Sequence, residues 1–186
     1  MDSSSQVSSG LVCKSDGCGK IRVLGSGYCK EHKRVARQKF YERISEAKAE
    51  KKAREEHYSY FWEQAHTEAM NAALAHTPTP MVVESHVNQM DDGSPVDQRW
   101  FVGEGMCGFA WVNVKPGNHS FANWLKAHGL GKRDSYYGGV TIWVSDFNQS
   151  VERKEKYART LANHLNRSFL SIGDKKIAFR SYSRLD

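Results

Sequence analysis

The sequence predicts an α+β protein. A small α/β sandwich, of order β-β-α-β-α-β around a mixed sheet, follows a compact cysteine and histidine module and a long charged helix. Three of the four cysteines and one histidine fall within residues 13–32, and a run without proline or glycine covers residues 31–75. After residue 98, runs of β-branched and aromatic residues alternate with two amphipathic helical patterns, which is typical of an α/β arrangement.

Changes in composition along the chain predict five segments. Residues 1–10 (MDSSSQVSSG) lack the basic and apolar regions expected of a secretory signal, and they are expected to form a disordered lead. Residues 11–34 form the cysteine and histidine module, and residues 35–75 form the long helix. Residues 76–97 are an acidic, proline-containing connector, and residues 98–186 are the α/β domain.

The module has the spacing C-x4-C-x10-C-x2-H, set by Cys13, Cys18, Cys29 and His32. Thiolates and imidazoles are the ligands of structural zinc, which binds four of them in a tetrahedron. Glycines beside the cysteines let the backbone turn so that its N–H groups face the sulfur atoms. Because four protein ligands leave no open position, the sequence predicts one structural zinc ion per chain. The last two ligands are expected in the first turn of the helix.

This knuckle resembles a treble-clef zinc finger, and it is similar to short zinc motifs of bacteriophage proteins. Those motifs have the form cysteine, Gly-Cys, Gly-x-Cys-x-x-His-x-x-Arg, and residues 13, 17–18 and 27–32 match the part up to the histidine. The resemblance covers about 25 residues of the chain. Because a segment this short has too little core to fold alone, metal binding is expected to provide most of its folding energy.

The long helix is predicted from its composition, since alanine, glutamate, lysine and arginine dominate it. Its first turns are basic directly after the zinc ligands. These side chains would either contact phosphate groups or form a solvated face with pairs four residues apart, and the sequence leaves both interpretations open. The basic residues are Lys33, Arg34, Arg37, Lys39 and Arg43.

The second half of the helix carries an apolar face. Tyr58, Trp62, Ala65, Ala69 and Ala73 recur at intervals of three and four, as on one side of a helix. This face needs a packing partner, with Tyr58 and Trp62 as the contact residues. A partner helix, a second copy of the chain in a homodimer, and the C-terminal domain all remain candidates.

In the C-terminal domain, strands are expected at residues 98–103, 107–115, 140–145 and 176–184, and helices at 121–129 and 149–170. The connector before it contains HTPTP, which ends the long helix, and the turn-rich segment NQMDDGSPVD, which reads as a linker or exposed loop. The domain is similar to one found in small proteins of tailed bacteriophages. The match lies in residues 108–112, 116–118, 124–126 and 135–149, and it implies a phage origin but no reaction.

The loop GLGKRDSYYGG, residues 129–139, is the predicted binding element of this domain. It places Lys132 and Arg133 beside Tyr136 and Tyr137. Basic groups neutralise phosphates, and aromatic rings stack on unpaired bases. The alternative is an ordinary loop between a helix and a strand, whose tyrosines cover the edge of the core.

No catalytic residue is assigned. Asp146 with ERK at residues 152–154, and the histidines of HSFANWLKAH at residues 119–128, only partly match metal-dependent nuclease sites, so a nuclease is kept as an alternative. The net charge is +6, with +4 over residues 11–75, −4 over 81–105 and +7 over 106–186. Two basic segments favour a polyanionic partner.

The predicted function is therefore that of a non-enzymatic, zinc-containing bacteriophage protein that binds nucleic acid or a nucleic-acid-bound host or phage complex. A virion or assembly component that acts through protein contacts is the other alternative. The expected location is the host cytoplasm during infection, or else the virion. No membrane partner is expected, because no apolar run reaches membrane-spanning length.

Overall fold

The computed structural model describes residues 12–91 and 93–186, so the lead expected at residues 1–10 lies outside the described part. The chain forms two compact units, Met1–Arg54 and Glu55–Asp186. The first contains the cysteine and histidine cluster, and the second contains strands and helices around one core. The α+β fold class predicted from the sequence is confirmed.

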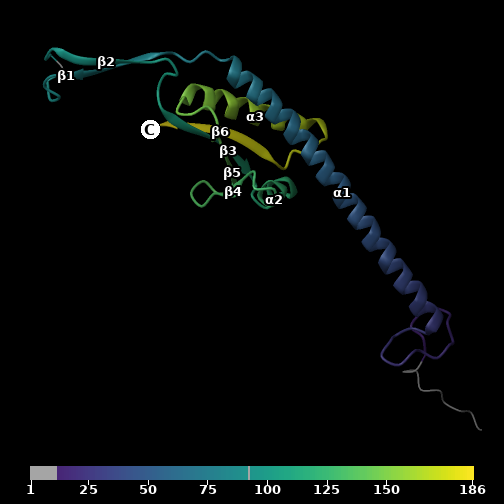
Figure 1. Cartoon of the computed structure of the whole chain (residues 1–186). Coiled ribbons are helices and arrows are strands. Elements are labelled where there is room, and N and C mark those ends of the chain that lie inside the picture. Colours follow the sequence, from purple (N-terminus) through teal and green to yellow (C-terminus); the bar gives the residue numbers. More distant parts are fainter. Residues whose placement is uncertain (1–11, 92) are drawn as a thin grey trace, which may run out of the picture. The chain divides into compact units, whose positions relative to one another are not determined.

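Helix α1, Lys30–Ala75, is continuous and begins directly after Cys29 (Figure 1). Its part in the first unit has no buried residue, whereas Tyr58, Phe61, Ala65, Ala69 and Ala73 are buried in the second unit. The apolar face expected from the sequence is therefore present. Phe61 is buried in it, and Trp62 packs at its border.

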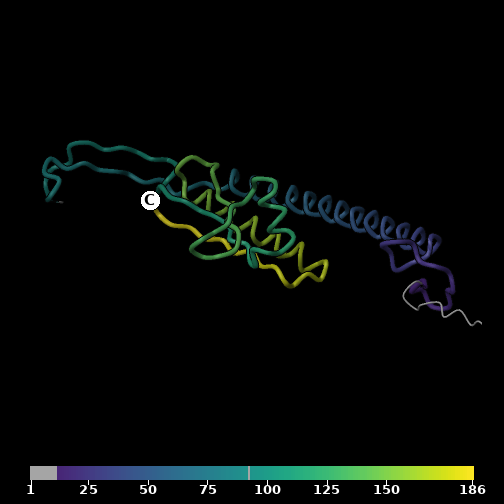
Figure 2. Tube along the Cα trace, turned by 90° about the horizontal axis from the view of Figure 1, so that it is seen from below, coloured from purple at the N-terminus to yellow at the C-terminus, as the bar shows by residue number. Residues whose placement is uncertain are grey.

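Strands β1, Met81–His86, and β2, Val96–Val102, pair antiparallel as a hairpin whose two strands run side by side in Figure 2. The sequence analysis expected a linker or exposed loop here, but residues 84–86 and 96–98 belong to the paired strands. The turn-rich segment joins the two strands instead of separating domains. Apolar side chains on the hairpin, among them Val82 and Phe101, remain exposed.

The second sheet has the order β4-β5-β3-β6. Its strands are β3, Gly108–Lys115; β4, Lys132–Arg133; β5, Val140–Trp143; and β6, Ala178–Leu185. Every strand pair in the described residues is antiparallel, although the sequence analysis expected a mixed sheet. The reason is that Val140 at the start of β5 pairs with Val114 at the end of β3, so the chain returns to the end of the sheet that it left.

The core of the second unit lies on one face of this sheet. Helices α2, Ser120–Ala127, and α3, Val151–Ser171, pack there together with the end of α1. Helix α3 runs beside β3 and β6 (Figure 1). Ala110, Val112 and Val114 alternate along β3 toward this core, in which Phe121 and Phe169 are fully buried. Among the described helices, none combines the length and the apolar character needed to cross a membrane.

Candidate metal centre and nucleic-acid interface

Cys13, Cys18, Cys29 and His32 come together in the first unit. Their four ligand atoms all lie within 4.8 Å of one another. His32 Nδ1 is 3.4 Å from the Sγ atoms of both Cys13 and Cys29, and Cys18 Sγ is 3.9 Å from Cys29 Sγ. The distance between the two sulfur atoms is far longer than a disulfide bond, which is about 2.05 Å. The cluster can therefore hold one metal ion.

These distances fit a tetrahedral zinc site. With Zn–S bonds of about 2.3 Å and Zn–N bonds of about 2.0 to 2.1 Å, a tetrahedron places two sulfur ligands about 3.8 Å apart and a sulfur and a nitrogen about 3.5 to 3.6 Å apart. Three of the separations, at 3.9 Å and twice 3.4 Å, lie close to these values, and the other pairs lie within 4.8 Å. The imidazole therefore faces the thiol groups through Nδ1.

Backbone N–H groups contact two sulfur atoms of the cluster. The Ser15 N–H donates to the sulfur of Cys13, and the Lys20 N–H donates to the sulfur of Cys18. Gly17, between Cys13 and Cys18, has a φ of 71°, a backbone conformation in which a residue with a side chain would be strained. This confirms the sequence-based expectation that turns beside the cysteines aim N–H groups at sulfur.

The same contacts favour the thiolate form at Cys13. Burial raises the pKa of its thiol, but hydrogen bonds from the backbone of Cys29 and Ser15 and from His32 outweigh burial and lower the pKa to about 6. Only a thiolate binds zinc. The contacts thus favour a deprotonated sulfur at Cys13. At Cys18 the hydrogen bond from the Lys20 N–H acts in the same direction, but burial and the neighbouring Cys13 and Cys29 raise the pKa.

The five basic residues of helix α1 do not share one side. At 3.6 residues per turn, Lys33, Arg34 and Arg37 lie on one face, whereas Lys39 and Arg43 lie on the other side. All five are exposed. The Arg37 guanidinium also lies 5.7 Å from the ring centre of Tyr41, one turn further along. The structure therefore brings three of the predicted residues into a basic stripe that begins beside His32.

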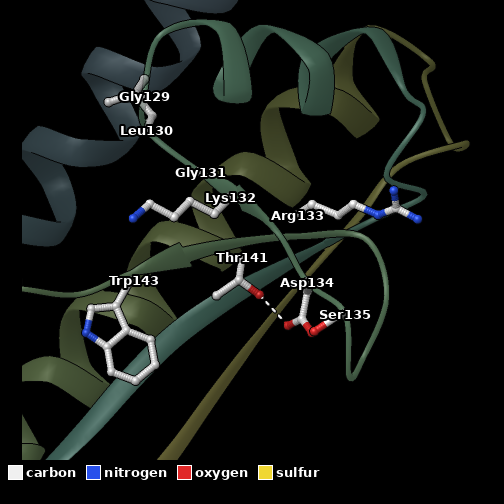
Figure 3. Close-up of a pocket in the computed structure, with 9 residues that line it drawn as sticks. All are labelled: Gly129, Leu130, Gly131, Lys132, Arg133, Asp134, Ser135, Thr141 and Trp143. Atoms are coloured by element: carbon white, nitrogen blue, oxygen red, sulfur yellow. Dashed lines mark hydrogen bonds between the residues drawn. The ribbon is translucent and has the colours of Figure 1, made fainter.

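The predicted loop of the second unit borders a hollow of about 500 Å³ (Figure 3). Lys132 and Arg133 extend to opposite sides of β4, so only Lys132 lies on the side of Trp143. Thr141 and Trp143 of β5 also line the hollow. The sequence analysis did not name them, although alternation along β5 puts both on the face opposite the core.

Asp134 holds the tip of this loop. Its carboxylate accepts hydrogen bonds from the hydroxyl of Thr141 and from the N–H groups of Tyr136 and Tyr137, and these bonds lower its pKa. Gly139 completes the turn, because a Cβ there would lie 2.4 Å from the carbonyl oxygen of Val114. Tyr136 is 85% exposed, and Tyr137 stacks on Tyr182 with ring centres 5.5 Å apart.

The apolar face of α1 packs on the C-terminal domain, one of the three candidates left open by the sequence. Tyr58 is buried against Phe121, and its hydroxyl lies 2.6 Å from the Ser120 hydroxyl. Trp62 is partly buried and stacks on His66. Tyr58 is thus a core residue of the second unit.

The side chains of the nuclease alternative take part in structural hydrogen bonds. His119 caps α2 by accepting from the Phe121 N–H through Nδ1, and its Nε2 lies 3.1 Å from a carboxylate oxygen of Asp174. Glu152 opens α3 and accepts hydrogen bonds from His76 and from the Thr79 N–H. These contacts give both residues a structural role at the start of a helix.

No family model, curated protein or solved structure matches the chain. Arguments about function therefore rest on the geometry of the two units.

Proposed function

We propose that the protein binds nucleic acid through its first unit, in which a structural zinc ion orders the start of a basic helix. The observation that carries this proposal is the stripe formed by Lys33, Arg34 and Arg37. It follows His32 within two helical turns. In the described residues, none of these three cations forms an ion pair with a carboxylate.

Zinc is the proposed metal because of the donor set. Three thiolates and one imidazole at tetrahedral spacing are typical of structural zinc, whereas calcium and magnesium take oxygen ligands. The four side chains fill the coordination shell, so the ion contributes folding energy and not catalysis. Its role in binding is to fix the direction in which the helix leaves the knuckle.

Exposed cations without carboxylate partners are suited to phosphate groups. Binding releases condensed counterions, so the affinity falls as salt rises, with a slope of about 0.9 per phosphate contact on duplex DNA. The phage origin expected from the sequence is compatible with the same proposal, and the proposed location of the binding is the host cytoplasm during infection.

The test compares two double variants on one helix. Arg34→Ala with Arg37→Ala removes two cations from the stripe, and Lys39→Ala with Arg43→Ala makes the same change of charge on the other side. Fluorescence anisotropy with labelled duplex DNA at several salt concentrations measures the slope. We expect the stripe variant to reduce it by about 2 and the control to change it less.

Equal slopes in the wild type and both variants would contradict the assignment of the stripe. Absence of any salt-dependent binding by the wild-type protein would reject the proposed function.

A further inference from the structure

The face of the sheet opposite the core carries a row of aromatic rings. Trp111 of β3 lies opposite Trp143 of β5 and Tyr182 of β6. The ring centres of Trp111 and Trp143 are 5.6 Å apart with planes at 7°, and those of Trp111 and Tyr182 are 6.1 Å apart with planes at 20°. Tyr137 stacks on Tyr182 from the loop. We call these four residues the aromatic row.

The row is accessible although its centre is covered. Trp143 is 50% exposed and Tyr137 is 43% exposed, whereas Trp111 between them is 8% exposed. The core residues of all three helices lie on the opposite face of the sheet, on the side of the β3 side chains that alternate with Trp111. The two ends of the row are therefore free to stack on a further flat ring.

Cations surround the aromatic row. Lys115, Arg180 and Arg184 share its face by alternation along β3 and β6, and Lys132 approaches from β4. Asp134 is the one acidic residue among those that line the hollows on this face. Its carboxylate already accepts two hydrogen bonds from its own loop and one from Thr141 of β5. The face is thus basic as well as aromatic.

Two hollows border the row. One, of about 500 Å³, is lined by Trp143 and Lys132, and the other, of about 540 Å³, by Trp111, Tyr182 and Arg184. Trp143, Thr141 and Asp134 belong to both. Each volume lies within the range of about 300 to 1,000 Å³ that is usual for ligand sites.

We propose that this face binds unpaired nucleotides of a single-stranded nucleic acid. Bases stack on Trp143 and Tyr137, and phosphates lie against Lys132, Arg180 and Arg184. Aromatic rings next to basic side chains are the general means by which proteins hold unpaired bases and their backbone. This inference rests on the proposed function and extends it, because it adds a second site and names single strands as its ligand.

The charge of the face distinguishes this ligand from two others. A duplex keeps the faces of its bases stacked within the helix, so it cannot use the aromatic row. A neutral oligosaccharide also stacks on tryptophan but gains nothing from four surrounding cations. A single strand uses both features, because it offers free base faces and one phosphate per nucleotide.

The test compares Trp143→Ala with Trp100→Ala in the full-length protein. Trp100 lies on the hairpin and is 46% exposed, so it is a matched exposed tryptophan away from the row. Anisotropy is measured with a labelled oligothymidylate and with a duplex of equal length. Loss of one stacked base corresponds to a weakening of about 5- to 150-fold. We expect this loss for Trp143→Ala with the single strand only, and wild-type affinity for Trp100→Ala.

Two further variants make the result specific. Trp143→Phe retains a ring and is expected to restore most of the affinity, while thermal unfolding shows whether each variant is folded. Arg184→Gln should reduce the salt dependence of single-strand binding. Unchanged single-strand affinity in folded Trp143→Ala would overturn the inference, and so would binding of a neutral oligosaccharide in place of the oligothymidylate.

The design separates this inference from the proposed function. If the wild-type protein binds duplex DNA through the basic stripe but Trp143→Ala behaves as Trp100→Ala, the aromatic row is rejected and the proposed function stands. If single-strand binding depends on Trp143 but duplex binding does not change when Arg34 and Arg37 are replaced, the aromatic row stands and the assignment of the stripe is rejected.

Discussion

The four cysteines of the chain have two different environments. Cys13, Cys18 and Cys29 face His32 in one cluster, whereas Cys107 lies at the start of the sheet in the second unit, where its backbone pairs with Ser150. The cluster could be predicted from the sequence because ligand spacing and adjacent glycines are local signals. The role of Asp134 in anchoring the tyrosine loop could not be predicted, because strand pairing brings its partner Thr141 next to it.

The contrast between the two environments gives a test of the metal ligands. Cys18→Ser removes one thiolate, so we expect bound zinc to fall below one per chain and the knuckle to lose its order. Cys107→Ser is the matched control and should keep one zinc per chain. Metal content of the purified proteins by mass spectrometry checks both, and full zinc occupancy in Cys18→Ser would show that the ligand assignment is wrong.

At the scale of elements, the end of α1 is joined to the start of α3. Arg153 donates to the carbonyl oxygens of Ala73 and Leu74 in the last turn of α1, where the helix offers few N–H partners. Glu152 accepts from His76 and Thr79. The sequence analysis considered these two residues only as part of a nuclease motif. Their role depends on two helices that are distant in sequence, so local patterns could not predict it.

Glu152 should stabilise the second unit in a pH-dependent way. The hydrogen bond from His76 lowers the pKa of the carboxyl group below its usual value of 4.5. The hydrogen bonds from Thr79 act in the same direction, and burial acts in the opposite direction. The ionised form therefore stabilises the fold above that pH, and this contribution is lost as the pH falls through the lowered pKa.

We expect Glu152→Gln to reduce the free energy of unfolding by about 1 kcal/mol at neutral pH. The difference from the wild type should disappear in acid, where the wild-type carboxyl group is also neutral. Urea unfolding at both pH values measures it, with the exposed residue Glu63 changed to Gln as the control. A difference that persists in acid would mean that the carboxylate charge is not the cause.

Helix α1 shows what sequence periodicity can and cannot settle. The apolar face from Tyr58 to Ala73 was predictable because apolar residues recur every three or four positions. The element that this face packs on was not predictable, since a partner helix, a second copy of the chain and the C-terminal domain could all cover it. The hairpin was missed because its turn residues resemble those of a linker, and its pairing depends on the register between β1 and β2.

For the whole molecule, the division into two units implies that they respond separately to loss of metal. Every residue of the main core cluster lies between Tyr58 and Phe179, and the part of α1 before Tyr58 has no buried residue. A helix without a packed face depends on its ends and on local charge pairs, so removal of zinc should loosen the knuckle and the first turns of α1.

Hydrogen exchange measured by mass spectrometry, with and without a zinc chelator, tests this separation on the full chain. Amides of residues 12–54 are expected to lose protection when zinc is removed, while those of β3, α3 and β6 keep theirs, because their core contains no metal ligand. Cys18→Ser without chelator should give the same pattern. Loss of protection in α3 on chelation would show that the two units fold as one, and that zinc contributes to the core of the second.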